Sequence, residues 1–144
     1  EVADLNSGDV ASIGGSDQGS STAALAFGGW ETSPAGVKDY TELWNGSTWT
    51  EVADLNTARS NVAGAGTSTS ALAMSGYTTT GTALVESWDG TSWSAAAALT
   101  NVNSDAGGAG ISANASIFGG YTTAIYAGME VYTGTPAIKT FTAS

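Results

Sequence analysis

The sequence predicts an all-β fold in which one four-stranded unit occurs three times. The first observation is an internal repeat: residues 43–49 align with residues 87–93 after a shift of 44 positions, from 43 to 87. A further shift of 44 reaches residues 131–134, where the turn glycine is kept. The second observation is a composition of 20 glycines, 2 prolines and 42 % hydrophobic residues, which favours short strands and tight turns around a packed interior. A repeat of this length indicates an array of stacked units.

Two further markers keep the same period. A small-residue pair followed by an aromatic occurs at residues 27–30, 74–77 and 118–121, and a leucine-containing segment occurs at residues 4–6, 54–56 and 98–100. The first interval is longer, 50 positions from 4 to 54, because the first unit carries extra residues around its Gly-Gly pair. Insertions at such points belong in loops.

Alternation of apolar and polar residues predicts four strands in the second unit, at residues 61–67, 70–75, 83–88 and 92–97. The last two strands of a unit are joined by Asn45-Gly46 or Asp89-Gly90, dipeptides that favour tight hairpins because both positions tolerate positive φ. Four antiparallel strands in each repeat are typical of a β-propeller blade.

We therefore expect a single propeller array over residues 1–144. Its blades are expected at residues 7–56, 57–100 and 101–144, the last ending in a C-terminal cap. Residues 1–6 repeat residues 51–56 and are either the remnant of another blade or an outer strand donated to a neighbouring chain. Blades that cannot each bury a core depend on their neighbours for stability.

Small residues at 63–66 and 107–110 suit the first strand of a blade, where the sheets converge on the central channel. Large residues suit the outer strands, where twisted sheets diverge and more volume must be filled. We assign structural roles to the repeated tryptophans, which pack between blades, and to the turn glycines; a sugar-stacking platform is the alternative for the tryptophans. These residues are Trp44, Trp49, Trp88, Trp93, Gly46, Gly90 and Gly134.

The run Val85-Glu86-Ser87-Trp88-Asp89-Gly90 with Trp93 resembles the kelch repeat, and residues 40–46 with Trp49 match it less strictly. Residues 129–132 match only the first half of the motif. The segment from residue 54 to residue 67 is similar to repeats in virion proteins of marine phages and in bacterial surface proteins. The resemblance implies a propeller of kelch-like blades, as in the central domain of galactose oxidase, displayed on a virion or outside a cell.

An enzyme is not expected. The chain has no histidine and no cysteine, so it lacks the copper ligands and the Cys-linked tyrosine that the galactose oxidase resemblance would require. Residues 87–93 superficially resemble the sialidase Asp-box, but the glycine follows the aspartate directly, and one arginine cannot form the cluster that binds a sugar carboxylate. No pattern brings two carboxylates together for glycoside hydrolysis. We expect no cofactor and no metal site. Calcium binding is the alternative, because acidic residues and asparagines recur in loops, although no Asp-x-Asp-x-Asp-Gly loop occurs.

The formal net charge is −10, from 13 acidic residues against three basic ones. Nucleic acid and anionic membrane surfaces need clustered cations, so neither is an expected partner. No apolar run approaches the length needed to insert into a membrane.

Three aromatic residues, Trp30, Tyr77 and Tyr121, follow the small-residue pair in each unit. Their loops are expected on one face of the disc, together with loops that carry Asn56, Arg59 and Asn101. Sugars stack their C–H faces on aromatic rings and direct their hydroxyls to polar side chains, so these six residues are the candidate ligand-binding site. The alternative is that the aromatics only cap the blade edges.

Closed propellers have about four to eight blades, so three blades leave two apolar faces exposed. We expect self-association, with two copies giving six blades, or completion of the ring by upstream blades of a longer parent chain. The expected function is non-catalytic recognition or adhesion through a glycan or surface receptor, at a virion or extracellular location. The alternative is a purely structural propeller that mediates protein assembly.

Overall fold

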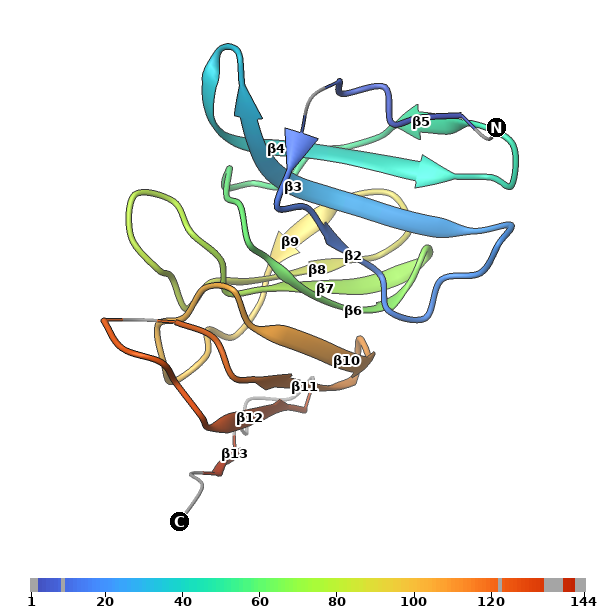
Figure 1. Cartoon of the computed structure of the whole chain (residues 1–144). Coiled ribbons are helices and arrows are strands. Elements are labelled where there is room, and N and C mark those ends of the chain that lie inside the picture. The colour runs from blue at the N-terminus through green and yellow to red at the C-terminus, as the bar shows by residue number, and fades with distance from the viewer. Residues whose placement is uncertain (1–2, 9, 122, 134–138, 142–144) are drawn as a thin grey trace.

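The fold was analysed in a computed structural model that describes residues 3–8, 10–121, 123–133 and 139–141. Three antiparallel sheets lie one above the other, in chain order (Figure 1). The second and third sheets have four strands each in simple up-and-down order, and the first has five. The expected all-β architecture of three blade-like sheets is confirmed.

The first blade contains a long hairpin, β3 (Ala24–Thr32) and β4 (Ala35–Trp44), which is followed by β5 (Trp49–Glu51). Two short strands, β1 (Val10–Ala11) and β2 (Gly14–Gly15), share the free edge of β3. A register shift between Phe27 and Gly29 separates the two halves of the hairpin. The extra residues of the first repeat thus lengthen this hairpin.

The second blade consists of β6 (Ala63–Thr67), β7 (Ser70–Met74), β8 (Val85–Trp88) and β9 (Trp93–Ala95). The third consists of β10 (Gly107–Ile111), β11 (Asn114–Phe118), β12 (Met129–Tyr132) and β13 (Lys139–Phe141). The strands of the second blade lie within two residues of the ranges that alternation predicts. Residues 3–6 form no strand.

Two apolar layers hold the blades together. Between the first and second blades lie Leu25, Phe27, Leu55, Val62, Ala71, Ala73, Trp88 and Trp93. Between the second and third blades lie Ala63, Ala65, Leu72, Met74, Val85, Leu99, Ala115, Ile117 and Tyr132. The innermost strands β2, β6 and β10 contact each other in series. The core is therefore formed between the sheets, as expected for blades that cannot fold alone.

Each blade has two successive residues with positive φ at the same place in the repeat, inside β3 in the first blade and directly after β7 and β11 in the other two. In the first blade these are Gly28 (φ 67°) and Gly29 (φ 127°), and in the second they are Ser75 (φ 56°) and Gly76 (φ 115°). Glycine adopts this conformation without steric cost, which explains why the small-residue pair recurs. In the second and third blades the next residue, the repeated tyrosine, pairs with the segment that enters its own blade.

Candidate functional site

The repeated aromatics occupy equivalent backbone positions. Tyr77 exchanges two backbone hydrogen bonds with Ser60, at 3.0 and 2.8 Å, and Tyr121 exchanges two with Ser104, at 2.9 and 2.8 Å. Each tyrosine is thereby fixed to the segment that enters its own blade. The two side chains remain 39 % and 51 % exposed, so the backbone is anchored while the ring faces solvent.

Tyr77 and Tyr121 line one groove at the junction of the second and third blades, with a volume of about 510 Å³. Exposed Val102, from the segment that enters the third blade, adds apolar surface. The other lining residues are small or carry hydroxyl groups, and none of the lining residues is charged: Thr79, Thr80, Gly81, Ser104 and Thr123. The groove thus combines two aromatic rings with several hydroxyls.

Backbone pairing between the blades supports this groove. Thr82 and Asn103 exchange N–H···O bonds of 3.3 and 3.2 Å, and the Gly76 N–H donates to the Asn103 carbonyl at 3.1 Å. The Asn103 side chain is buried and donates to the Gly119 carbonyl at 2.5 Å. The two tyrosines therefore stand on segments that are hydrogen-bonded across the blade boundary, which limits relative movement of the rings.

Trp30 lies in β3 of the first blade, where it pairs with Ala11 and Val37. Its backbone position corresponds to those of the tyrosines, and its side chain is 38 % exposed. Trp30 does not line the tyrosine groove. The structure therefore brings two of the three predicted aromatics together and leaves the third on the long first-blade hairpin.

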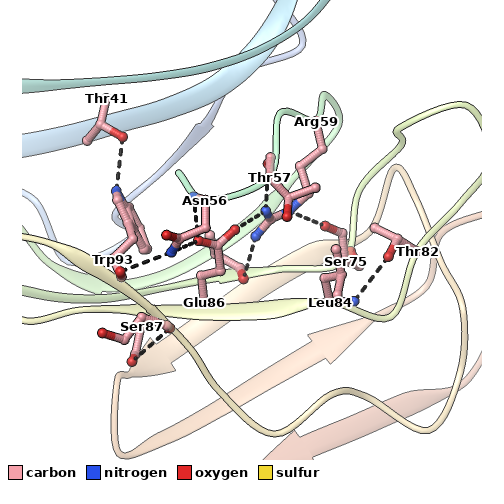
Figure 2. Close-up of polar contacts among 12 residues, drawn as sticks. Thr41, Asn56, Thr57, Arg59, Ser75, Thr82, Leu84, Glu86, Ser87 and Trp93 are labelled. Atoms are coloured by element: carbon pink, nitrogen blue, oxygen red, sulfur yellow. Dashed lines mark hydrogen bonds and ion pairs between the residues drawn. The ribbon is translucent and has the colours of Figure 1, made fainter. Parts of the chain in front are cut away.

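Asn56 is tied to the outer part of the second blade (Figure 2). Its backbone N–H and its amide nitrogen both donate to Glu86 Oε2 at 2.7 Å, and the amide nitrogen also donates to the Trp93 carbonyl at 3.0 Å. Although Asn56 is exposed, its amide nitrogen is engaged within the blade. It does not line the groove.

Arg59 is 0 % exposed and occupies the centre of this network. Its guanidinium forms an ion pair with Glu86 and donates to the carbonyl oxygens of Ser75 at 3.0 Å, Thr57 at 2.9 Å and Ala73 at 3.2 Å (Figure 2). A buried arginine whose donors all face protein oxygens holds the loop that enters the second blade. It presents no group to a ligand at the surface.

The hydrogen bonds between an asparagine and a glutamate recur in the other two blades. In the first blade, Asn6 donates from its backbone and side chain to Glu42, at 2.8 and 2.9 Å. In the third blade, Asn101 donates to Glu130 from its backbone at 2.8 Å and from its side chain at 2.6 Å. The repeated asparagines therefore join each entering loop to the third strand of its blade, and Asn101, like Asn56, lies outside the groove.

Burial and hydrogen bonding shift the pKa values of these carboxylates in opposite directions. Burial would raise the pKa of Glu86, but hydrogen bonds from Arg59 and Asn56 outweigh it and hold the pKa below the ordinary value. Burial likewise would raise the pKa of Glu42, and donors on Ser7 and Asn6 lower it below that value. Both groups are therefore stabilised as carboxylates, the form that accepts these hydrogen bonds.

The repeated tryptophans lie at blade boundaries and hairpins. Trp88 and Trp93 are buried, with ring centroids 5.4 Å apart, and Trp93 packs edge-on against Phe27 at 4.9 Å. Trp44 is 9 % exposed and Trp49 is half-buried, with their centroids 5.4 Å apart. These positions suit packing better than ligand stacking.

The hairpin glycines adopt positive φ, 97° at both Gly46 and Gly90. In the second hairpin, the N–H groups of Ser92 and Thr91 donate to Asp89 and lower the pKa of its carboxyl. Gly134 lies outside the described residues.

A second cleft of about 400 Å³ lies beside the first blade and contains Glu31, Glu42 and Glu51. Glu31 forms an ion pair with Lys38 at 2.6 Å, and Glu42 is held by Asn6 and Ser7. Within the described part of the chain, no three acidic side chains are arranged to hold a metal ion. The described residues also include no helix of the length and apolarity that a membrane span requires.

Sequence reasoning did not identify most of the groove. The threonines that line it follow Tyr77 and Tyr121 closely in sequence, and Val102 follows Asn101 directly. A polar, threonine-rich loop after each repeated tyrosine was the available signal. It marks a site only once the structure shows that loops from two blades meet.

Neither a protein-family model nor a curated protein sequence matches the chain. The solved structure of YjhT, a kelch-type β-propeller protein, superposes with a TM-score of 0.75 at 11 % sequence identity. The match covers 92 % of this chain and 45 % of the YjhT chain, so the chain spans less than half the length of that protein. Similarity at this identity shows the fold alone, which is that of a partial propeller with three blade-like sheets.

Proposed function

We propose that the chain is a non-catalytic recognition propeller that binds a neutral glycan in the groove between Tyr77 and Tyr121. The observation that carries the proposal is the pair of exposed rings, contributed by adjacent blades, in a groove with threonine hydroxyls. Among the described residues that line the groove, none carries a carboxylate, imidazole or thiol that would act as an acid, base or nucleophile. Binding is therefore the activity that this chemistry supports.

Carbohydrate fits the groove because a pyranose ring has apolar C–H faces and a hydroxyl rim. The faces would stack on Tyr77 and Tyr121, while the hydroxyls would meet the side chains of Thr79, Thr80 and Thr123. A volume of about 510 Å³ falls within the usual range of small-ligand sites and accommodates a short oligosaccharide.

A neutral glycan fits better than an acidic one. The groove has no basic side chain, Arg59 is buried, and Lys38 is paired with Glu31. The net charge of −10 would also repel a sugar carboxylate or sulfate. Display on a virion or outside a cell would give such a site access to glycans, and we propose that location.

The test is a glycan array probed with the 144-residue chain, followed by titration calorimetry on the glycans that bind. Tyr77→Ala and Tyr121→Ala are expected to weaken binding at least about tenfold, equivalent to ~1.4 kcal/mol. The matched control is Leu84→Ala, because Leu84 is 40 % exposed but does not line the groove. Trp30→Ala is expected to change affinity less than either tyrosine variant.

A structural propeller that mediates protein assembly is the second candidate. It is favoured by the apolar side chains left exposed on the third blade, including Phe118 at 46 % and Ile111 at 49 %. Absence of binding to any neutral glycan, with assembly unaffected by Tyr77→Ala, would support this candidate over recognition.

A further inference from the structure

The outer face of the third blade exposes a residue whose counterparts are buried. Phe118 ends β11 and is 46 % exposed. Phe27 and Met74 occupy the same register opposite the innermost strand of their blades, and they are 1 % and 0 % exposed. Phe27 and Met74 each lie in an apolar layer between two blades of this chain, whereas Phe118 does not.

The first internal boundary shows what covers such a residue. The ring of Phe27 packs edge-on against Trp93 of the second blade, with centroids 4.9 Å apart. The Trp93 indole N–H also donates to the Thr41 hydroxyl of the first blade at 3.0 Å (Figure 2). At this boundary the first blade therefore presents its second-strand aromatic to a tryptophan of the second blade.

The opposite end of the array carries the complementary face. Ala24 and Ala26 in β3 are half-buried, whereas Ala71 and Ala73, at the same register in the second blade, are 0 % exposed. Trp49 corresponds to Trp93, yet it is only half-buried, and among the described residues no acceptor is recorded for its N–H. This face is therefore the uncovered equivalent of the face that the second blade presents to the first.

The innermost strands also distinguish the two ends of the array, because each one after the first packs against the backbone of the blade before it. A Cβ on Gly64 would clash with the Gly15 carbonyl, and a Cβ on Gly108 would clash with the Gly64 carbonyl, so each glycine admits the backbone of the blade before it. Gly15 occupies the same register in the first blade. A Cβ added to it would approach only the Leu25 carbonyl of its own blade, at 3.3 Å. The space that a preceding backbone would fill is open at Gly15.

We propose that the third blade docks head to tail on the first blade of a second copy, with Phe118 packed against Trp49 of that copy. Two such contacts close a ring of six blades, within the range of known propellers. The contact is heterologous, because different faces meet, and heterologous contacts that close form rings. A second copy supplies a tryptophan and small side chains like those of the boundary between the first and second blades, together with the open glycine.

The test is the solution mass of the folded chain by light scattering and native mass spectrometry. The wild type is expected at twice the chain mass of 14.2 kDa. Phe118→Glu and, separately, Trp49→Lys are each expected to shift the mass to one copy at the same concentration. Ile125→Glu is the matched control, because Ile125 is 88 % exposed and pairs with Tyr121 on the loop between β11 and β12.

Mixing the two single variants makes the test specific for head-to-tail docking. The mixed pair has one unaltered contact and one in which the introduced carboxylate faces the introduced ammonium, so a two-copy mass is expected to return. Circular dichroism checks that each variant is folded. Ala24→Lys on the same face replaces Trp49→Lys if loss of the Trp44 contact unfolds the chain.

A folded wild-type monomer would overturn the proposal and show that other blades or another protein cover these faces. An assembly that grows beyond two copies with concentration would overturn closure into six blades. A two-copy mass that survives Trp49→Lys and Ala24→Lys but not Phe118→Glu would indicate symmetric pairing of third blades, and would also contradict the proposal.

Discussion

In each blade, a small residue of the first strand lies opposite a large apolar residue of the second strand, and its size is matched to that partner. Gly14 faces Phe27 and Gly107 faces Phe118, whereas Ala63 faces Met74. A Cβ on Gly14 would lie 2.8 Å from Phe27 Cε2 and 2.9 Å from the Val62 carbonyl oxygen. A rigid ring over the first strand therefore requires glycine there, while a flexible methionine tolerates alanine.

Gly14→Ala is therefore expected to lower the free energy of unfolding by about 1–3 kcal/mol, as overpacking of a filled core does. The double variant Gly14→Ala with Phe27→Met should lose less than the sum of the two single changes, because the ring clash is removed. Urea denaturation of the four proteins measures this coupling. Strict additivity would contradict the size-matching argument.

Arg59 lies in a buried position that its place in the sequence did not indicate. It follows Asn56 in a loop that the repeat assigns to one face of the disc, which made it a candidate for ligand contact. The structure instead buries it against Glu86 and three carbonyl oxygens. Sequence could not reveal this, because most of the acceptors are distant in the chain: Ala73 and Ser75, 14 and 16 residues away, and Glu86.

Arg59→Met should cost about 3–5 kcal/mol, because it leaves the buried Glu86 carboxylate without its cation. Adding Glu86→Gln should recover part of that loss, since the unpaired charge is removed. Chemical denaturation of the single and double variants measures both effects. Glycan binding, compared in the folded fraction, should be unchanged if Arg59 acts only inside the blade.

Acid should weaken this network. The folded-state pKa of Glu86 lies below its ordinary value, so its stabilisation is complete above the unfolded carboxyl pKa of about 4.3 and is lost as the pH falls through the folded pKa. Glu86→Gln should lower stability at neutral pH and flatten the decline on acidification. Glu42, whose pKa is also lowered, should retain part of the slope. Urea denaturation at stepped pH measures the free energy of unfolding as a function of pH. If its slope were the same in Glu86→Gln as in the wild type, the prediction would be contradicted.

At the scale of elements, local pattern predicted most of the strands. The second-blade strands and the turns at Gly46 and Gly90 follow from alternation and from dipeptides that accept positive φ. The first blade was less predictable, because its extra residues extend the β3–β4 hairpin past a register shift instead of forming a loop. The break in its first strand between β1 and β2 lies opposite Gly28 and Gly29 of β3 and has no local signal.

Asp17 links the inner edges of all three blades. It follows β2 at the position that glycine occupies in the other blades, and its carboxylate accepts from the N–H groups of Gly66 at 2.7 Å and Gly110 at 2.9 Å. The adjacent Gln18 N–H donates to the Gly66 carbonyl at 2.9 Å. One exposed side chain thus joins strand ends that are 49 and 93 residues away in sequence.

Asp17→Ala is expected to destabilise the chain by about 1 kcal/mol, the usual net value of such hydrogen bonds at a solvated site. The free energy of unfolding of Asp17→Asn should lie between those of Asp17→Ala and the wild type, because one acceptor oxygen remains. Hydrogen exchange gives the specific measurement: the amides of Gly66 and Gly110 should lose protection in Asp17→Ala, while the amide of Leu55, bonded to Asp39, should not. Unchanged exchange at both glycines would remove the linking role.

At the scale of the whole molecule, the repeat period predicted the number of blades but only part of the candidate site. Tyr77 and Tyr121 share a groove because the segments after them meet the entering segment of the third blade, a contact between residues such as Thr82 and Asn103. Trp30 obeys the same repeat and lies elsewhere. The repeat period identifies equivalent positions in the three blades. It does not show that the extra residues of the first blade place Trp30 apart from the two tyrosines.

Because the groove belongs to two blades, glycan affinity should depend on one blade boundary and not on the other. Ile117 is 3 % exposed in the layer between the second and third blades, and Leu25 is 2 % exposed in the layer between the first and second. Ile117→Ala and Leu25→Ala should each cost about 2–5 kcal/mol of stability, since both leave a cavity.

Only Ile117→Ala should weaken glycan binding, by several-fold, because it loosens the packing that sets the separation of the two tyrosine rings. Calorimetric titration at a temperature where both variants are folded measures this, and saturating glycan should raise the melting temperature of each protein according to its affinity. Equal affinity in the two variants would show that each tyrosine binds within its own blade. The groove would then be two independent contacts instead of one site formed by the assembly of blades.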